Sequence, residues 1–229
     1  AEYDVPSASL LGKRQTSFLK SWTARTEDLP IRWFLSQTMF SKANTHTGTN
    51  LKRSRLSLDC NSWPQSARNR ALRTLGRDTI MVHGDQHIGV LARMGIDEHD
   101  DGPLAFMVTG TSVGFPRAWW PEQEPADGPL NGPWTGRFID DQGHPITIHG
   151  VTNPDPLPEG VTDARERPDL EDKGVFAIQA AKGSGHGLVT VDKKKQEATF
   201  QAYRLDFDAA KPQDTDQFPG FPVTLKLAE

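Results

Sequence analysis

The chain has 229 residues, 35% of them hydrophobic, and its 30 Asp and Glu against 26 Lys and Arg give a formal net charge of −4. This length is enough to bury a core. The slightly acidic balance argues against a nucleic-acid partner, because such binding needs a basic surface. No apolar run approaches the ~18 residues of a membrane span, so none is expected. A single cysteine excludes an internal disulfide.

The first part of the chain alternates between helical and strand patterns. Apolar residues recur at helical spacing over 10–24, and the short apolar run 31–35 is typical of a buried strand. A second helix is predicted between Ser62, a capping residue type, and Gly76, a residue type that ends helices. Its predicted inner face is Ala67, Ala71, Leu72 and Leu75. The apolar run 79–82 follows as another buried strand. This order of strand, helix and strand indicates the α/β fold class.

The second part has the pattern of β structure. Short apolar runs lie between clusters of turn residues, and the arms 188–191 and 198–205 predict a hairpin. The acidic stretch 154–173 has no periodicity, so we expect a loop there. We therefore divide the chain into 1–103, with alternating helices and strands, and 104–229, which is mainly β. The other runs that predict strands in the second part are 105–110, 134–139, 146–153 and 174–180.

The segment 79–89 carries the strongest chemical signal. A predicted buried strand leads into Gly84, then Asp85 and His87, then a second glycine. Glycine permits a sharp turn, and open α/β sheets bind ligands where their strands end. Carboxylate and imidazole together suit zinc, iron or manganese. The pattern therefore predicts a metal site at Asp85 and His87. The alternative interpretation is a capping aspartate and a packed histidine.

Several motifs along the chain resemble those of one known family. They lie in the first and second predicted helices, at the glycine turn, in the segments just after it, and near the end of the chain. The motifs are Leu11-Gly12, Phe18-Leu19, Leu35-Ser36-Gln37-Thr38, Trp63-Pro64 with Arg68, Gly84-Asp85-Gln86-His87, Gly95-Ile96-Asp97, Pro116-Arg117 with Trp119-Trp120-Pro121, and Phe218-Pro219-Gly220-Phe221-Pro222. Together they resemble the alkaline phosphatase D-like metallophosphatases, which are calcineurin-like metallophosphoesterases.

The resemblance implies a fold and a cellular location. The fold is a four-layer α/β/β/α sandwich with a β-rich carboxy-terminal subdomain, of which this chain is the carboxy-terminal part. By the resemblance, 1–103 supplies part of the α/β layer with the last metal-ligand turn. The remaining residues, 104–229, complete the second sheet and the terminal subdomain. A periplasmic or extracellular location is also implied.

The function that the resemblance implies is hydrolysis of a phosphoester by two divalent or trivalent metal ions (iron, zinc, manganese or calcium). Such a pair clamps the phosphate and lowers the pKa of the attacking water. Asp85 and His87 match the last ligand motif, which makes them catalytic and metal-binding. Asn61 and Arg68 lie where substrate would bind, and His83 would orient a ligand. A surface arginine and a strand-end histidine are the alternatives for Arg68 and His83.

The sequence departs from the family pattern in one respect. The earlier ligand motifs Gly-Asp-x-x-Asp and Gly-Asn-His do not occur, and Asn44-Thr45-His46 lacks the preceding glycine. We therefore expect the other ligands in an amino-terminal part of the same fold, in cis or as another chain. A homologue that has lost the motifs is the alternative. Its function would be that of a non-catalytic β-rich module binding carbohydrate or protein, with Trp119, Trp120 and Trp134 near its glycine-proline loops.

Overall fold

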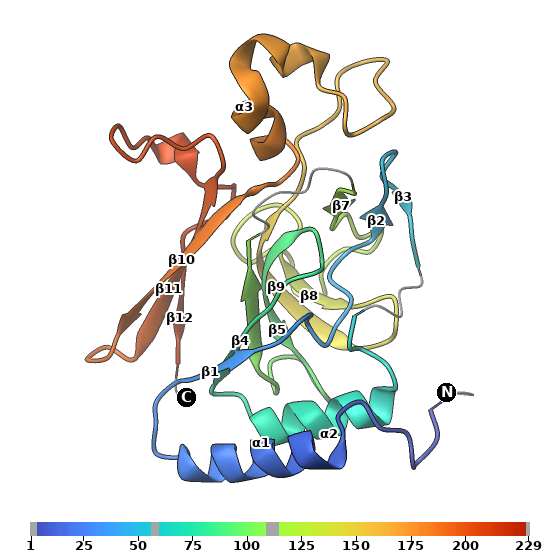
Figure 1. Ribbon diagram of the computed structural model, residues 1–229, viewed down its shortest axis with the longest axis vertical. Coiled ribbons are helices and arrows are strands. Elements are labelled where there is room, and N and C mark those ends of the chain that lie inside the picture. The colour runs from blue at the N-terminus through green and yellow to red at the C-terminus, as the bar shows by residue number, and fades with distance from the viewer. Residues whose placement is uncertain (1–3, 56–59, 109–114, 228–229) are drawn as a thin grey trace.

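The computed structural model describes residues 4–55, 60–108 and 115–227, which form three sheets and a small number of helices (Figure 1). This mixed α/β architecture confirms the expected α/β class. The helices are α1 (Lys13–Arg25), α2 (Gln65–Leu75) and α3 (Gly174–Ala180), with 3-10 turns at Pro168–Lys173 and Asp214–Asp216.

The largest sheet has six strands in the order β1-β4-β6-β5-β9-β8. β1, β4 and β6 run parallel to one another, while β5, β9 and β8 join by antiparallel pairing. Strands from 1–103 and from 104–229 alternate in this sheet, so the predicted boundary falls inside it. The strands are β1 (Arg32–Leu35), β4 (Thr79–Val82), β5 (Gly89–Met94), β6 (Leu104–Met107), β8 (Gly136–Ile139) and β9 (Pro145–Thr152).

Helices α1 and α2 cover one face of this sheet (Figure 1). Helix α2 forms because Ala67, Ala71, Leu72 and Leu75 recur at helical spacing, and all four are buried as the sequence predicts. Ala71, Leu72 and Leu75 pack on the sheet in the main hydrophobic cluster, together with Leu19 of α1. Burial of these apolar side chains, rather than the weak intrinsic propensity of a short helix, holds α2 in place.

The start of α2 differs from the prediction. Pro64 is the N-cap and gives no side-chain cap, while the Ser62 hydroxyl contacts Gln142 instead. A backbone N–H group in the first turn of α2 instead finds its hydrogen-bond acceptor in a distant residue. The Asp4 carboxylate accepts hydrogen bonds from the Ser66 N–H at 3.1 Å and from the Ser66 hydroxyl at 2.6 Å. These bonds lower the pKa of Asp4, with the Ser66 hydroxyl as the main cause. A cap supplied from 62 residues away has no local sequence signal.

The opposite face of the large sheet is covered by a three-stranded sheet of β10 (Gly185–Asp192), β11 (Glu197–Arg204) and β12 (Val223–Lys226). β10 and β11 are the predicted hairpin. Phe200 of β11 is fully buried and meets Phe106 of β6 edge-on, with ring centroids 5.2 Å apart. The layers therefore follow the order helix, large sheet, small sheet.

The third sheet is small and joins β2 (His46–Thr47), β3 (Lys52–Arg53) and β7 (Arg117–Ala118). β2 pairs with both neighbours in antiparallel register. A third hydrophobic cluster forms beside it, where Leu51 and Ala118 pack against Ala164 of the long loop. This packing brings the segment that follows β6 next to the segment that follows β1.

The prediction of a strand at 174–180 is wrong, because these residues form α3. A short apolar run does not distinguish a buried strand from a helix by periodicity alone. Ala177 and Ala180 have the best helix propensity of any residue type. Only Gln179 and Ala180 of the helix are buried, while Phe176 is 65% exposed. The run is therefore a surface helix rather than an inner strand.

The loop after α3 is held against the large sheet by a close approach at Gly183. Its φ is +83°, and a Cβ there would collide with the Thr152 carbonyl oxygen. Gly183→Ala is expected to cost ~1–2 kcal/mol in left-handed strain and a further ~1–3 kcal/mol in overpacking. Urea unfolding measures this loss. Gly160→Ala is the matched control, because Gly160 has φ +80° and open space around its Cβ position. This variant should show only the loss from left-handed strain. Equal losses in both variants would contradict the close approach.

Candidate functional site

The carboxyl ends of β1, β4 and β6 lie at one edge of the large sheet, because these three strands are parallel neighbours. This is where open α/β sheets place their sites. The loops that follow the strands touch each other there. The Gly84 N–H donates to the Gln37 carbonyl at 3.1 Å, and Gln86 Nε2 donates to the Thr38 hydroxyl at 2.6 Å. The turn after β4 is therefore anchored to the loop after β1.

The turn after β4 has an unusual backbone. Asp85 has φ +68° and His87 has φ +51°, both in the left-handed region. Residues other than glycine rarely adopt this region, and such conformations gather at functional sites. Gln86 between them is fully buried, whereas Asp85 is exposed and His87 half-buried. The turn thus uses its middle residue as an anchor and leaves the two predicted ligands accessible.

The His87 ring is oriented by the backbone of the loop after β6. Its Nδ1 lies 2.8 Å from the Phe115 carbonyl oxygen, and the two rings meet edge-on with centroids 6.1 Å apart. A carbonyl only accepts hydrogen bonds, so Nδ1 carries the hydrogen and Nε2 keeps its lone pair. Metal-binding histidines typically have this arrangement, in which the second nitrogen bonds to a backbone carbonyl or a carboxylate. In a neutral ring this contact leaves Nε2 as the nitrogen that a metal ion could bind.

His83 lies just before the turn and is buried. Burial lowers the pKa of His83 to about 4, so the ring is neutral at pH 7. Its Nδ1 faces the Gly84 carbonyl oxygen at 3.3 Å, and its Nε2 is buried without a hydrogen-bond partner. The contact to Gly84 places His83 against the turn itself. That it orients a metal ligand stays a prediction.

Asn61, one of the two predicted substrate-binding residues, lies close to the turn after β4. Asn61 is half-buried and lines a groove of about 680 Å³ that Gln37, Phe34 and Phe18 also line. Because the Gln37 carbonyl accepts from Gly84, this groove lies beside the turn, and substrate binding by Asn61 stays a prediction.

Arg68 is fully buried, and its guanidinium is used within the protein. Nε donates to the Phe40 carbonyl at 2.7 Å, Nη1 to the Gly95 carbonyl at 2.7 Å, and Nη2 to the Ser41 hydroxyl at 2.8 Å. Burial lowers the pKa of Arg68 to about 10, which still leaves the group charged at pH 7. These contacts tie α2 to two loops. We therefore leave Arg68 out of the proposed substrate site.

The donors at the turn fit a metal ion in type. Asp85 supplies carboxylate oxygens and His87 supplies a free imidazole nitrogen, which together suit zinc, iron or manganese. Within 4–55, 60–108 and 115–227, no group of three or more His, Cys, Asp or Glu side chains is placed to hold a metal. The turn thus carries two candidate donors, and a protein metal site usually has at least three.

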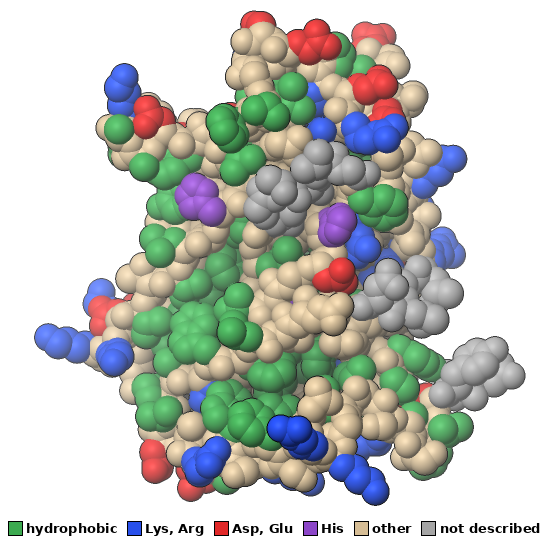
Figure 2. Space-filling view, viewed as in Figure 1, with side chains coloured by type: hydrophobic (Ala, Val, Ile, Leu, Met, Phe, Trp, Pro, Cys, Tyr) green, Lys and Arg blue, Asp and Glu red, His purple; other side chains and the backbone are tan. Residues whose placement is uncertain are grey.

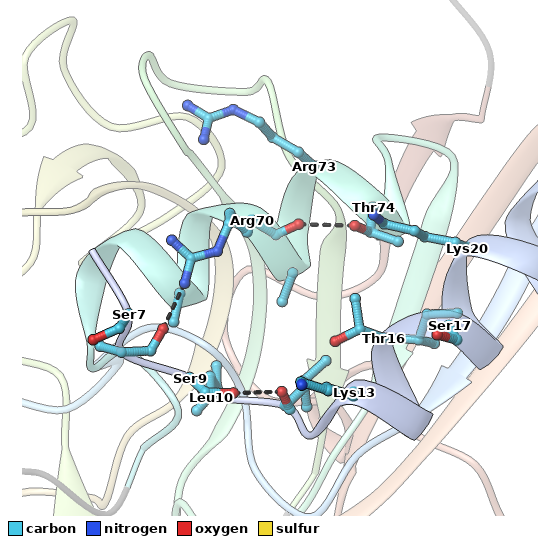
Figure 3. Close-up of a pocket in the computed structure, with 15 residues that line it drawn as sticks. Ser7, Ser9, Leu10, Lys13, Thr16, Ser17, Lys20, Arg70, Arg73 and Thr74 are labelled. Carbon is cyan, nitrogen blue, oxygen red and sulfur yellow. Dashed lines mark hydrogen bonds between the residues drawn. The ribbon is translucent and has the colours of Figure 1, made fainter. Parts of the chain in front are cut away.

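A second groove, of about 670 Å³, lies between α1, α2 and residues 7–11 (Figure 3). Basic and hydroxyl side chains line it. Arg70 Nη2 donates to the Ala8 carbonyl at 2.6 Å, and the Thr74 hydroxyl donates to the Arg70 carbonyl at 2.9 Å. None of the residues predicted as a site lines this groove, so it is separate from the turn after β4.

Two features of the segment after β6 lie outside the set of predicted site residues. Arg117 is only 9% exposed, and its Nε and Nη1 are buried without a hydrogen-bond partner. The signal available in the sequence was its position in the Pro-Arg-x-Trp-Trp-Pro motif. The other feature is a Gly-x-Ser-x-Gly sequence at 110–114, which lies outside the described residues. β7 follows it, not the helix that follows a nucleophile elbow.

Comparison with known proteins finds no matching family model, curated protein or solved structure. The class that the fold defines is a mixed α/β protein in which a helix layer and a small sheet enclose a six-stranded sheet. The relationship to metallophosphatases stays a prediction. In the described part of the chain, no helix has the length and apolar character needed to cross a membrane.

Proposed function

We propose that this chain is part of a metal-dependent phosphoester hydrolase, a phosphomonoesterase or a phosphodiesterase. Asp85 and His87 hold metal in a two-metal centre. The observation that carries the proposal is the turn after β4. It leaves both side chains accessible at the carboxyl edge of three parallel strands, and the His87 ring is fixed through Nδ1 at 2.8 Å from the Phe115 carbonyl oxygen.

Each residue of the turn has a defined part in this proposal. When bound, the metal pair supplies a water of lowered pKa and a clamp on the phosphate. His87 presents Nε2, because its Nδ1–H is held by Phe115. Asp85 brings the negative charge that offsets the cations. Gln86 anchors the turn through Thr38. Iron, zinc and manganese fit this donor pair best, and calcium prefers oxygen ligands.

The proposal places the remaining metal ligands in an amino-terminal part of the same fold, in cis or as another chain. The order helix, large sheet, small sheet supports the proposed α/β/β/α sandwich, which would have one further layer. Edge strand β1 supports a larger assembly, because Trp33 is 42% and Leu35 78% exposed, and Phe18 of α1 is 59% exposed. Figure 2 shows hydrophobic side chains gathered on this face. A periplasmic or extracellular location belongs to the same proposal.

A non-catalytic carbohydrate- or protein-binding module is the second candidate. One observation favours it: Trp120 and Trp134 line a groove of about 470 Å³ together with several prolines. Trp134 is 43% exposed and so is available to a ligand. Trp119 is not available, because it is 1% exposed and packs edge-on against Phe138 in the main core. A binding module of this kind needs no metal, which separates the two candidates.

The test is a measurement of metal-dependent hydrolysis. Protein from the complete coding region is stripped with a chelator, reloaded with zinc, manganese or iron, and assayed with p-nitrophenyl phosphate and bis-p-nitrophenyl phosphate. We expect hydrolysis to disappear on stripping and to return on reloading, because the attacking water needs the metal. Protein that binds no metal and hydrolyses neither ester would contradict the proposal and favour the binding module.

A further inference from the structure

Arg117, the first residue of β7, is a buried cation without a partner. Its side chain is 9% exposed, and neither Nε nor Nη1 makes a hydrogen bond. No carboxylate in the described part of the chain forms an ion pair with it. The sequence just before it, 109–114, contains no Asp or Glu. Burying an uncompensated charge is costly. The Arg117 guanidinium is therefore expected to be stabilised by an anion.

Two other buried arginines, Arg68 and Arg93, donate hydrogen bonds to carbonyl or hydroxyl groups of the protein. Arg93 Nη1 donates to the Arg77 carbonyl at 3.1 Å and to the Gly102 carbonyl at 3.0 Å. The Arg68 guanidinium has carbonyl and hydroxyl partners at 2.7–2.8 Å. Those two arginines hold loops together. Arg117 is 9% exposed, slightly more than Arg68 and Arg93, and its Nε and Nη1 lack such contacts, so these two donors are unused within the protein.

The backbone of the Arg117 segment is tied to the same edge of the sheet as the turn after β4. Arg117 follows Phe115 by two residues, and the Phe115 carbonyl orients His87 at 2.8 Å. The next residue, Ala118, accepts from the Thr45 N–H at 2.8 Å, in the loop after β1. Arg117 and the two proposed metal ligands therefore come from segments that are held together.

We infer that Arg117 binds an oxyanion, and that in the proposed hydrolase this oxyanion is the phosphoryl group of the substrate. Nε and a terminal nitrogen of arginine form a planar fork that binds two oxygens of a phosphate or carboxylate at once. In Arg117 the Nε donor of the side-on fork and the Nη1 donor of the end-on fork are both buried without a hydrogen-bond partner. The assignment of the phosphoryl group rests on the proposed function, whereas oxyanion binding by Arg117 does not depend on a metal.

The test is binding of inorganic phosphate to the metal-free chain in a chelator, measured by titration calorimetry. Arg117→Gln should weaken phosphate binding at least ~10-fold, because a charge-assisted hydrogen bond contributes ~1.5–3 kcal/mol. Arg117→Lys should recover part of the affinity, since lysine keeps the charge without the fork. Arg55→Gln is the control, with a side chain 76% exposed, and should bind like the unaltered chain.

Thermal unfolding without phosphate separates a binding role from a structural one. Arg117→Gln should then melt no lower than the unaltered chain, because it removes an uncompensated buried charge. A lower melting temperature, or phosphate affinity equal to that of the unaltered chain, would overturn the inference. A different result would contradict the proposed function alone. In that case the chain would bind phosphate through Arg117 but would bind no metal, and His87→Ala would change neither phosphate binding nor metal binding.

Discussion

Replacing His87 with alanine is expected to remove metal from the turn after β4 and to abolish phosphoester hydrolysis. The imidazole is one of two donors that the described residues bring to the site, and its Nδ1 contact to Phe115 already fixes its orientation. Losing a residue that merely supports a ligand costs ~10–100-fold in metal affinity or activity, and loss of the ligand should cost more. Metal content and p-nitrophenyl phosphate hydrolysis measure the effect.

The matched control for this substitution is His186→Ala. His186 is an exposed histidine on β10 that stacks on Tyr203, with ring centroids 5.5 Å apart. It makes no contact with the turn among the interactions of the described residues. We expect this variant to keep both its metal and its activity. Activity retained in His87→Ala at the level of His186→Ala would show that His87 is not a ligand.

Arg68→Ala is expected to have the largest effect on stability. The substitution leaves the Phe40 and Gly95 carbonyls without their buried donor and opens a void between α2 and two loops. Each buried acceptor left without its donor costs ~1–3 kcal/mol, and the void adds to this loss. Urea unfolding at neutral pH measures the loss as a lower midpoint. The loss should appear with or without metal, because Arg68 acts through the fold.

Arg73→Ala on the same helix is the control. Its ion pair with Asp97 spans 2.7 Å, but the two side chains are 50% and 67% exposed. Exposed pairs contribute ~0–1 kcal/mol, so this variant should unfold close to the unaltered chain. If Arg68→Ala is as stable as Arg73→Ala but loses phosphate binding, Arg68 belongs to the substrate site after all.

The fold could be predicted where local pattern and tertiary packing agree. The α2 segment has its apolar residues at helical spacing, and all of the predicted inner face is buried. The hairpin of β10 and β11 was predicted from two alternating arms around a polar turn. α3 was missed because helix and strand are both compatible with a short apolar run. β5, Gly89–Met94, shows no alternation of buried and exposed residues, because all six of its residues are buried. The two-residue period of a half-buried strand is therefore absent there.

The site could be predicted in part. The glycine turn and the Asp-x-His spacing place Asp85 and His87 at the end of β4, where the structure has them. The sequence gives no indication that Arg68 points inward to the Phe40 and Gly95 carbonyls, because these partners lie 28 and 27 residues away. Arg117 stands in the Pro-Arg-x-Trp-Trp-Pro motif, but the motif does not indicate that its side chain is buried. Its importance comes from burial without a partner, which only the packed chain reveals.

The most direct measurement is anomalous X-ray diffraction from crystals of the protein loaded with zinc or manganese. For zinc we expect an anomalous peak about 2.0–2.1 Å from His87 Nε2 and about 2.0–2.2 Å from an Asp85 carboxylate oxygen. His87 Nδ1 should still lie against the Phe115 carbonyl. A fully loaded crystal with no peak beside His87, or with metal bound only at other residues, would contradict the account.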